Sequence, residues 1–176
     1  MRRRPGRVGV CLVLLAALLA GAGSGAAEAP LPLVDLHIHY NAWVAADLTP
    51  EAAVRRLQEH GAIGGVVSST PTANAMRLAA RAPGVLVPFF RPYLTEGHRG
   101  KWQQDPAVLT EAEAGLKGGQ YRGIGEVHLF AANVGGDAGN PILAGLLRLA
   151  RRHRVPVQVH VDAAEIPVLN ALLTAF

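Results

Sequence analysis

Two histidines stand two residues apart near the end of an apolar stretch, Leu33–Tyr40 (LVDLHIHY). If this stretch is a β-strand, alternate side chains share a face, so His37 and His39 point the same way as Asp35. Two imidazoles on one face near a strand end can bind the same divalent cation. Asp35 lies one step deeper, where it is placed to orient the first histidine.

Two later stretches carry side chains of the same kinds. On Tyr121–Leu129 (YRGIGEVHL), Glu126 and His128 share a face, and Pro156–Val161 (PVQVHV) contains His160. A single histidine such as His160 is more often a satisfied core residue than a ligand. The presence of Glu126 and His160 together with the two histidines of the first stretch nevertheless favours a metal site. Active sites gather at the carboxyl ends of parallel strands, where all these residues are expected.

Three residues are candidates for catalysis and substrate binding. We expect Glu126 and His128 to be catalytic groups, although His128 could instead simply pack in the core. Arg91 ends the apolar stretch Val85–Arg91 and is the candidate for binding a substrate anion. An ordinary ion pair is the alternative role for this arginine.

The elements that must position these residues alternate along the chain. Short runs rich in Val and Ile are followed by helical patterns, and such βα alternation predicts a parallel sheet with helices packed on it. The α/β class leaves two architectures: an open doubly wound sheet, or a TIM-like (β/α)₈ barrel truncated after about five βα units. The remaining strand is predicted at 63–68, and the helices at 51–60, 73–82, 107–117, 142–153 and 164–176.

Polar residues mark where several of these helices begin. Thr49 is the expected N-cap of the first predicted helix, Thr72 or Thr70 of the second, and Asn140 of the fourth. Their short side chains accept hydrogen bonds from the otherwise unpaired amides of a first helical turn. These positions therefore predict where the helices start.

The N-terminal segment has the pattern of a secretory signal peptide. Residues 1–7 are basic, Val8–Ala20 is an apolar run of 13 residues, and small residues follow up to Pro30. A membrane-spanning helix needs about 20 apolar residues, so this run predicts a cleaved signal over residues 1–29. We expect a periplasmic or secreted protein without stable membrane insertion. A retained anchor is the alternative.

Composition excludes several classes of site. The sequence has 17 Lys and Arg against 13 Asp and Glu, but four of the arginines lie in the first seven residues. Without them the chain has 13 basic and 13 acidic residues, so nothing indicates a nucleic-acid partner. Cys11 is the single cysteine, which rules out a disulfide within the chain and a metal site built from cysteines.

The motifs VDLHIHY, RGIGEVHLF and VPVQVHVD, in this order and spacing, resemble the amidohydrolase superfamily of metal-dependent hydrolases. The nearest branches are the amidohydrolase-related and TatD-like ones, and the resemblance covers residues 33–176. It implies that His37, His39 and His160 bind metal and that Glu126 binds or bridges it. One or two divalent ions are expected, with Zn²⁺ the default and Mn²⁺, Fe²⁺ or Ni²⁺ as alternatives.

The fold implied by this resemblance is a (β/α)₈ barrel, which needs about 250 residues. The family's strand-six histidine and strand-eight aspartate have no counterpart here, so we expect residues 30–176 to be the N-terminal part of an enzyme. A short form that pairs with another chain is the alternative, and the oligomeric state is left open.

The implied activity is hydrolysis of an amide, ester or lactone, or phosphoester bond in a small molecule by metal-activated water. Two other classes remain open. One is an exported, non-catalytic metal- or ligand-binding α/β protein. The other is an α/β binding domain in which the histidines are structural.

Overall fold

The computed structural model describes residues 31–129 and 139–175. The predicted signal peptide lies outside the described residues. The fold is that of the compact unit Pro32–Phe176. Within the described ranges, every helix is too short or too polar to cross a bilayer.

Five short strands run parallel to one another. Strand β1 pairs with β2 and β2 with β3, whereas β4 pairs with β5 in a second ladder. Phe90, directly after β3, bridges to Ile124 at the start of β4, and its amide donates to the Gly123 carbonyl over 2.9 Å. The strands are β1 (Leu33–Ile38), β2 (Ala62–Ser68), β3 (Leu86–Phe89), β4 (Ile124–His128) and β5 (Val157–His160).

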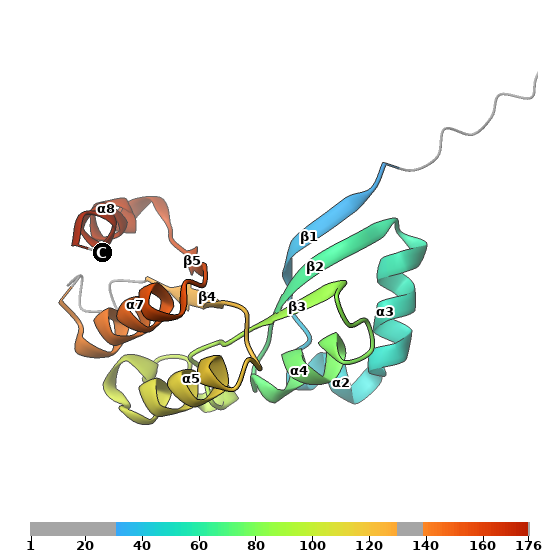
Figure 1. Cartoon of the computed structure of the whole chain (residues 1–176), viewed down its shortest axis with the longest axis horizontal. Helices are drawn as coiled ribbons and strands as arrows, with labels where there is room; N and C mark the ends of the chain where they lie inside the picture. Colours follow the sequence, from blue (N-terminus) through green and yellow to red (C-terminus); the bar gives the residue numbers. More distant parts are fainter. Residues whose placement is uncertain (1–30, 130–138, 176) are drawn as a thin grey trace, which may run out of the picture. The chain divides into compact units, whose positions relative to one another are not determined.

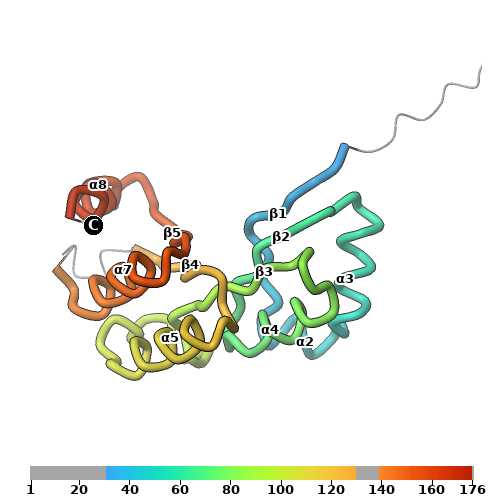
Figure 2. Tube along the Cα trace, viewed as in Figure 1, coloured from blue at the N-terminus to red at the C-terminus, as the bar shows by residue number. Residues whose placement is uncertain are grey.

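Helices follow the strands along the chain, as the tube in Figure 2 shows. The α-helices are α2 (Ala42–Asp47), α3 (Pro50–Glu59), α4 (Ala73–Ala79), α5 (Ala107–Lys117), α7 (Pro141–His153) and α8 (Ile166–Ala175). Short 3₁₀ turns lie at η1 (Glu96–His98), η2 (Trp102–Gln104) and η3 (Ala163–Glu165). The predicted α/β class with parallel strands alternating with helices is confirmed. The described strands do not form the closed barrel.

Two of the three predicted helix caps are confirmed. Thr49 Oγ1 accepts from the Ala52 amide over 3.2 Å, and Asn140 Oδ1 accepts from Ile142 and Leu143 over 3.1 and 3.0 Å. Thr72, which with Thr70 was a candidate cap, occupies the N-cap position of α4, but its side chain makes no capping hydrogen bond. This residue already has helical φ and ψ angles (−58° and −28°) rather than the extended backbone of a capping residue.

Two apolar cores hold the helices against the strands, one on each side of the β3–β4 junction (Figure 1). In the first core, α3 and α4 pack on β1–β3, with Val67 and Leu78 fully buried. In the second, α5 and α7 pack on β4 and enclose Ile124 and Val127. The described residues thus have two apolar cores, linked by the bridge between Phe90 and Ile124.

One hydrogen bond brings the first and last strands together. Gln158 Nε2, on β5, donates to the Leu36 carbonyl of β1 over 2.8 Å, although these strands are not neighbours in either ladder. The strands therefore curve so that β1 and β5 approach each other on one side. The side chains at the strand ends on that side are directed toward a common region.

Candidate metal centre

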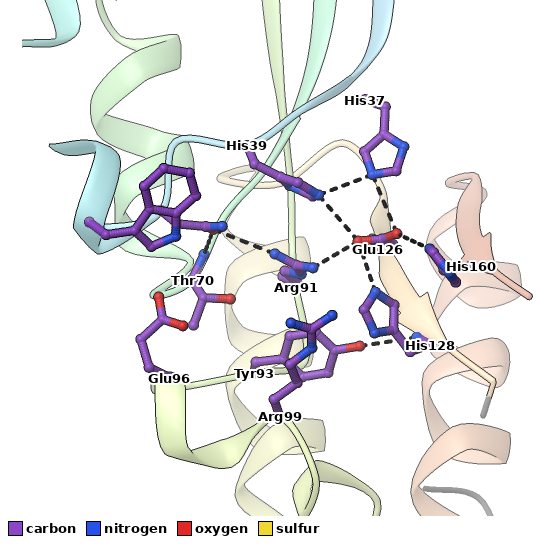
Figure 3. Close-up of a pocket in the computed structure, with 12 residues that line it drawn as sticks. His37, His39, Thr70, Arg91, Tyr93, Glu96, Arg99, Glu126, His128 and His160 are labelled. Carbon is purple, nitrogen blue, oxygen red and sulfur yellow. Dashed lines mark hydrogen bonds and ion pairs between the residues drawn. The ribbon is translucent and has the colours of Figure 1, made fainter. Parts of the chain in front are cut away.

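Glu126 on β4 is the centre of the site drawn in Figure 3. Its side chain is 2% exposed, and four imidazoles and one guanidinium contact its carboxylate. His160 Nδ1 lies 2.8 Å and His37 Nε2 3.3 Å from Oε1. Arg91 Nη2 lies 2.7 Å, His128 Nε2 3.0 Å and His39 Nε2 3.3 Å from Oε2.

The backbone of Glu126 is held by β2. Ser68 Oγ accepts from the Glu126 amide over 2.5 Å and donates to the Gly125 carbonyl over 2.7 Å. Gly125 has a φ of +142°, and a Cβ there would lie 2.6 Å from the Gln158 carbonyl oxygen. Only glycine fits this backbone at this distance from β5. The Gly-Glu pair in the sequence thus lets β5 pack directly beside the carboxylate.

His39 is oriented by the backbone of β2. Its Nδ1 lies 2.5 Å from the Ser68 carbonyl oxygen, which can only accept, so Nδ1 carries the proton. Nε2, which lies 3.3 Å from Glu126 Oε2, is therefore the nitrogen that the neutral form of the ring would offer to a metal ion. A histidine that donates one ring nitrogen to a backbone carbonyl and offers the other is typical of metal ligands.

His37 completes the β1 side of the site. Its Nε2 lies 3.0 Å from His39 Nε2, and its side chain is 51% exposed. Asp35 Oδ1 accepts from the His37 backbone amide over 2.9 Å. The expected contact between Asp35 and the His37 ring is therefore not made, because the carboxylate turns back to the main chain of its own strand.

On the opposite side of Glu126, His128 and His160 come from β4 and β5 with ring centroids 4.6 Å apart. His128 is almost completely buried, whereas the His160 side chain is 39% exposed. The Tyr93 hydroxyl accepts from the His128 amide over 3.0 Å, and its ring meets the His128 ring edge-on. Tyr93 thereby fixes the end of β4.

The electrostatics of the site follow from burial and these contacts. Burial alone would raise the pKa of the Glu126 carboxyl, but hydrogen bonds from His128 and His39 outweigh it and hold the pKa well below its usual range. Burial lowers the pKa of Arg91, and the charge of Glu126 opposes that shift. Burial raises the pKa of Tyr93 to about 12. At neutral pH the site therefore contains an ionised carboxylate beside a neutral phenol.

The donor atoms fit a divalent ion. Two ligands that each lie 2.0–2.2 Å from an ion, at tetrahedral or octahedral angles, are about 3.0–3.5 Å apart. The separations among His37 Nε2, His39 Nε2 and the Glu126 oxygens are 3.0–3.3 Å. A lone pair on His39 Nε2 facing an ionised carboxylate is repulsive unless a cation or proton lies between them. The chemistry of the donors thus matches a cation site.

Two sets of three residues could each hold an ion, and both include Glu126. The first is His37, His39 and Glu126, and the second is Glu126, His128 and His160. In each set the ligand atoms all lie within 4.8 Å of one another. The cluster can therefore hold a metal ion, and a shared carboxylate is the geometry that would allow two.

The structure brings together all six residues selected from the sequence. His37, His39, Glu126, His128 and His160 form the cluster described above. Arg91 is 4% exposed and lies two residues beyond β3, with Nη1 3.5 Å from Asn41 Oδ1 in addition to its ion pair. This places the arginine within the site, where its guanidinium already contacts Glu126.

Sequence reasoning missed Ser68, Tyr93 and Asn41. Ser68 begins a polar run, Ser-Ser-Thr, at the carboxyl end of β2, and that position is the signal that could have identified it. Tyr93 and Asn41 likewise lie within a few residues of strand ends. Beside the cluster is a cavity of about 390 Å³, whose further lining residues are Asn41, Trp43, Thr70, Tyr93, Glu96 and Arg99.

Comparison of the chain with protein-family models, with curated proteins and with solved structures gives no match. The described residues themselves define a buried His/Glu cluster that could bind a metal ion, next to a cavity large enough for a small molecule. The chemistry of the site is inferred from this geometry.

Proposed function

We propose that this chain belongs to a metal-dependent hydrolase of the amidohydrolase type. Its substrate would be a small molecule with an amide, ester or lactone, or phosphoester bond, which metal-activated water cleaves. The observation that carries this proposal is the buried carboxylate of Glu126, contacted by imidazoles from three strands. Burying a charged carboxylate costs free energy. A buried carboxylate surrounded by imidazoles therefore indicates a functional site.

A divalent ion would supply Lewis acidity, lowering the pKa of a coordinated water from about 15.7 toward about 7 and polarising the bond to be cleaved. His37, His39 and Glu126, or Glu126, His128 and His160, would hold the ion. The Ser68 carbonyl holds the His39 ring in the tautomer that a ligand needs. Zn²⁺ is the ion that best suits neutral imidazoles with one carboxylate, and Mn²⁺, Fe²⁺ and Ni²⁺ are alternatives.

His128 and Arg91 have supporting roles in this proposal. His128 Nε2 lies 3.0 Å from Glu126 Oε2, close enough to exchange a proton with groups bound at the carboxylate. The Arg91 guanidinium, 2.7 Å from the same oxygen, fixes the carboxylate and offsets its charge. These contacts would hold Glu126 in one orientation during turnover.

The proposed fold is a set of βα units built as in a (β/α)₈ barrel. Three features support it: the parallel strands follow one another in chain order, helices separate them, and β1 and β5 approach each other through Gln158 and Leu36. The candidate ligands also lie toward the carboxyl ends of β1, β4 and β5, where barrel enzymes carry their active sites.

We further propose that the protein is exported through its N-terminal segment and acts in the periplasm or outside the cell. The basic residues 1–7 and the 13-residue apolar run support export. Residues 30–176 contain no cysteine, which suits an oxidising compartment, since Cys11 lies in the proposed signal. N-terminal sequencing of the exported protein should find a start between residues 23 and 30.

Elemental analysis of the purified full chain tests the hydrolase proposal. We expect one or two divalent ions per chain in the wild type and a loss of most of this metal in the double variant His37→Ala/His39→Ala. The fold of that variant should survive, because both side chains are partly exposed. His60→Ala is the control, since His60 is an exposed residue at the end of α3. Equal metal in the wild type and the double variant would overturn the site and the hydrolase assignment together.

A further inference from the structure

Two arginines line the cavity beside the cluster. Arg91 is buried beneath it, with its Cζ 4.9 Å from the centre of the Tyr93 ring. Arg99, an exposed residue directly after η1, lies beside the same tyrosine (Figure 3). Both arginines therefore line the same cavity as the Glu126 cluster.

The charges of these two arginines are balanced differently. Arg91 is neutralised by Glu126 at 2.7 Å. Arg99 forms no ion pair with any residue in the described ranges, and Glu96, which also lines the cavity, is exposed and likewise forms none there. Arg99 and Glu96 therefore contribute one positive and one negative charge to the cavity lining, and neither is in an ion pair with a described residue.

A second observation points to a missing acceptor. Arg91 is 96% buried, yet its Nε has no hydrogen-bond partner within the part of the chain that the structure describes. A buried donor left unpaired costs about 1–3 kcal/mol, so an acceptor that reached this nitrogen would be stabilised. The residues lining the cavity thus include a buried arginine with one donor left without an acceptor among the described residues, and a second arginine, Arg99, outside any described ion pair.

The cavity lining also includes an apolar surface. Trp43 on α2 lines the cavity and is 68% exposed, which is unusual for so large a hydrophobic side chain. Its indole offers a flat surface against which the body of a small molecule can pack. Polar groups and an apolar surface therefore line one cavity of about 390 Å³.

We propose that the substrate is a small carboxylic acid, bound by its carboxylate at Arg99 and Arg91 and by its apolar part at Trp43. The proposal rests on the proposed function, because it places the bond to be cleaved beside Glu126. A carboxylate is favoured over a phosphate because Glu96, in the same lining, opposes a second negative charge on the ligand, and the planar guanidinium matches a carboxylate with two hydrogen bonds.

The test measures anion binding to the full chain after removal of metal with 1,10-phenanthroline, a chelator that carries no carboxylate. Sodium propionate is titrated while the fluorescence of Trp43 is followed, since Trp102, the other tryptophan, is fully buried. We expect saturable binding to the wild type, and binding at least tenfold weaker in Arg99→Gln. Arg55→Gln should bind like the wild type, because Arg55 is equally exposed on α3 but does not line the cavity. Propionamide, which lacks the charge, should bind at least tenfold more weakly than propionate.

Several outcomes would overturn the carboxylate site: no binding by the wild type, equal binding by Arg99→Gln, binding only after metal is restored, or tighter binding of inorganic phosphate than of propionate. The result is independent of metal content. Propionate binding that depends on Arg99 in a chain without a metal site would leave the carboxylate site standing and remove the hydrolase proposal alone.

Discussion

The strands β1 and β4 supply the two sides of the same cluster in opposite environments. All five residues of β4 are buried, and its Glu126 and His128 lie within packed protein. Strand β1 pairs only with β2 among the described strands, and its Leu36 is 61% exposed. One side of the site is therefore part of the core, whereas the other lies along a sheet edge.

Because of this difference, the candidate ligands on β4 are held in place by the fold, whereas those on β1 are held less firmly. The β4 side is fixed by Ser68, Arg91 and Tyr93 before any ion binds, so its geometry depends on the stability of the fold. A substitution of His37 on the β1 side should cost little stability, because the side chain is half-exposed. Substitutions on β4 should therefore lower stability and metal affinity together, and substitutions on β1 should lower metal affinity alone.

The largest effect is expected for Glu126→Gln. Removing this charge leaves the Arg91 guanidinium buried without its counterion, which costs about 3–5 kcal/mol. Urea denaturation of the metal-free protein should show this loss, and metal binding should be abolished. The control is Glu113→Gln, which breaks the exposed pair with Arg152 and should cost less than about 1 kcal/mol. Equal stability of the two variants would mean that the buried pair does not stabilise the fold.

An intermediate effect is expected for Ser68→Ala. This change removes the hydroxyl that holds the Gly125–Glu126 backbone, and we expect metal affinity to fall about 10- to 100-fold. Ser69→Ala is a matched control, because Ser69 is equally buried and its hydroxyl accepts from the Tyr40 amide. Both variants should lose about 1–3 kcal/mol of stability. Isothermal titration with Zn²⁺ separates them, and the same loss of affinity in both would refute a positioning role for Ser68.

The smallest effect on stability is expected for His37→Ala. The side chain is 51% exposed, so the free energy of unfolding should change by no more than about 0.5 kcal/mol. Zn²⁺ affinity should nevertheless fall more than tenfold, because one donor of the first set is lost. Unchanged affinity would place the ion on the β4–β5 side alone.

Much of this arrangement could be predicted from local sequence. The period of two in LVDLHIHY places His37 and His39 together, and Thr49 and Asn140 mark helix starts, because these signals act over a few residues. Helix α2 was not predicted, since its six residues include no acidic residue in the first turn and Asn41 makes no capping bond. Such a short helix depends on tertiary contacts rather than on propensity.

The contacts that fix the site could not be predicted in this way. Ser68 and Glu126 are 58 residues apart, and only the neighbouring positions of β2 and β4 bring them together. Thr72 was expected to cap α4, but its hydroxyl donates to the Arg91 carbonyl, 19 residues away. The burial of Arg91 likewise depends on how β3 meets β4. Long-range packing determines these interactions, and a single sequence carries little information on it.

X-ray absorption at the zinc edge tests the central claim most directly. The full chain loaded with one equivalent of Zn²⁺ should show nitrogen and oxygen neighbours at about 2.0–2.2 Å, with the outer-shell pattern of at least two imidazoles. The His37→Ala/His39→Ala variant should lose that imidazole pattern. A shell of oxygens alone, or a sulfur neighbour near about 2.3 Å from Cys11, would show that the ion binds elsewhere and would contradict the site around Glu126.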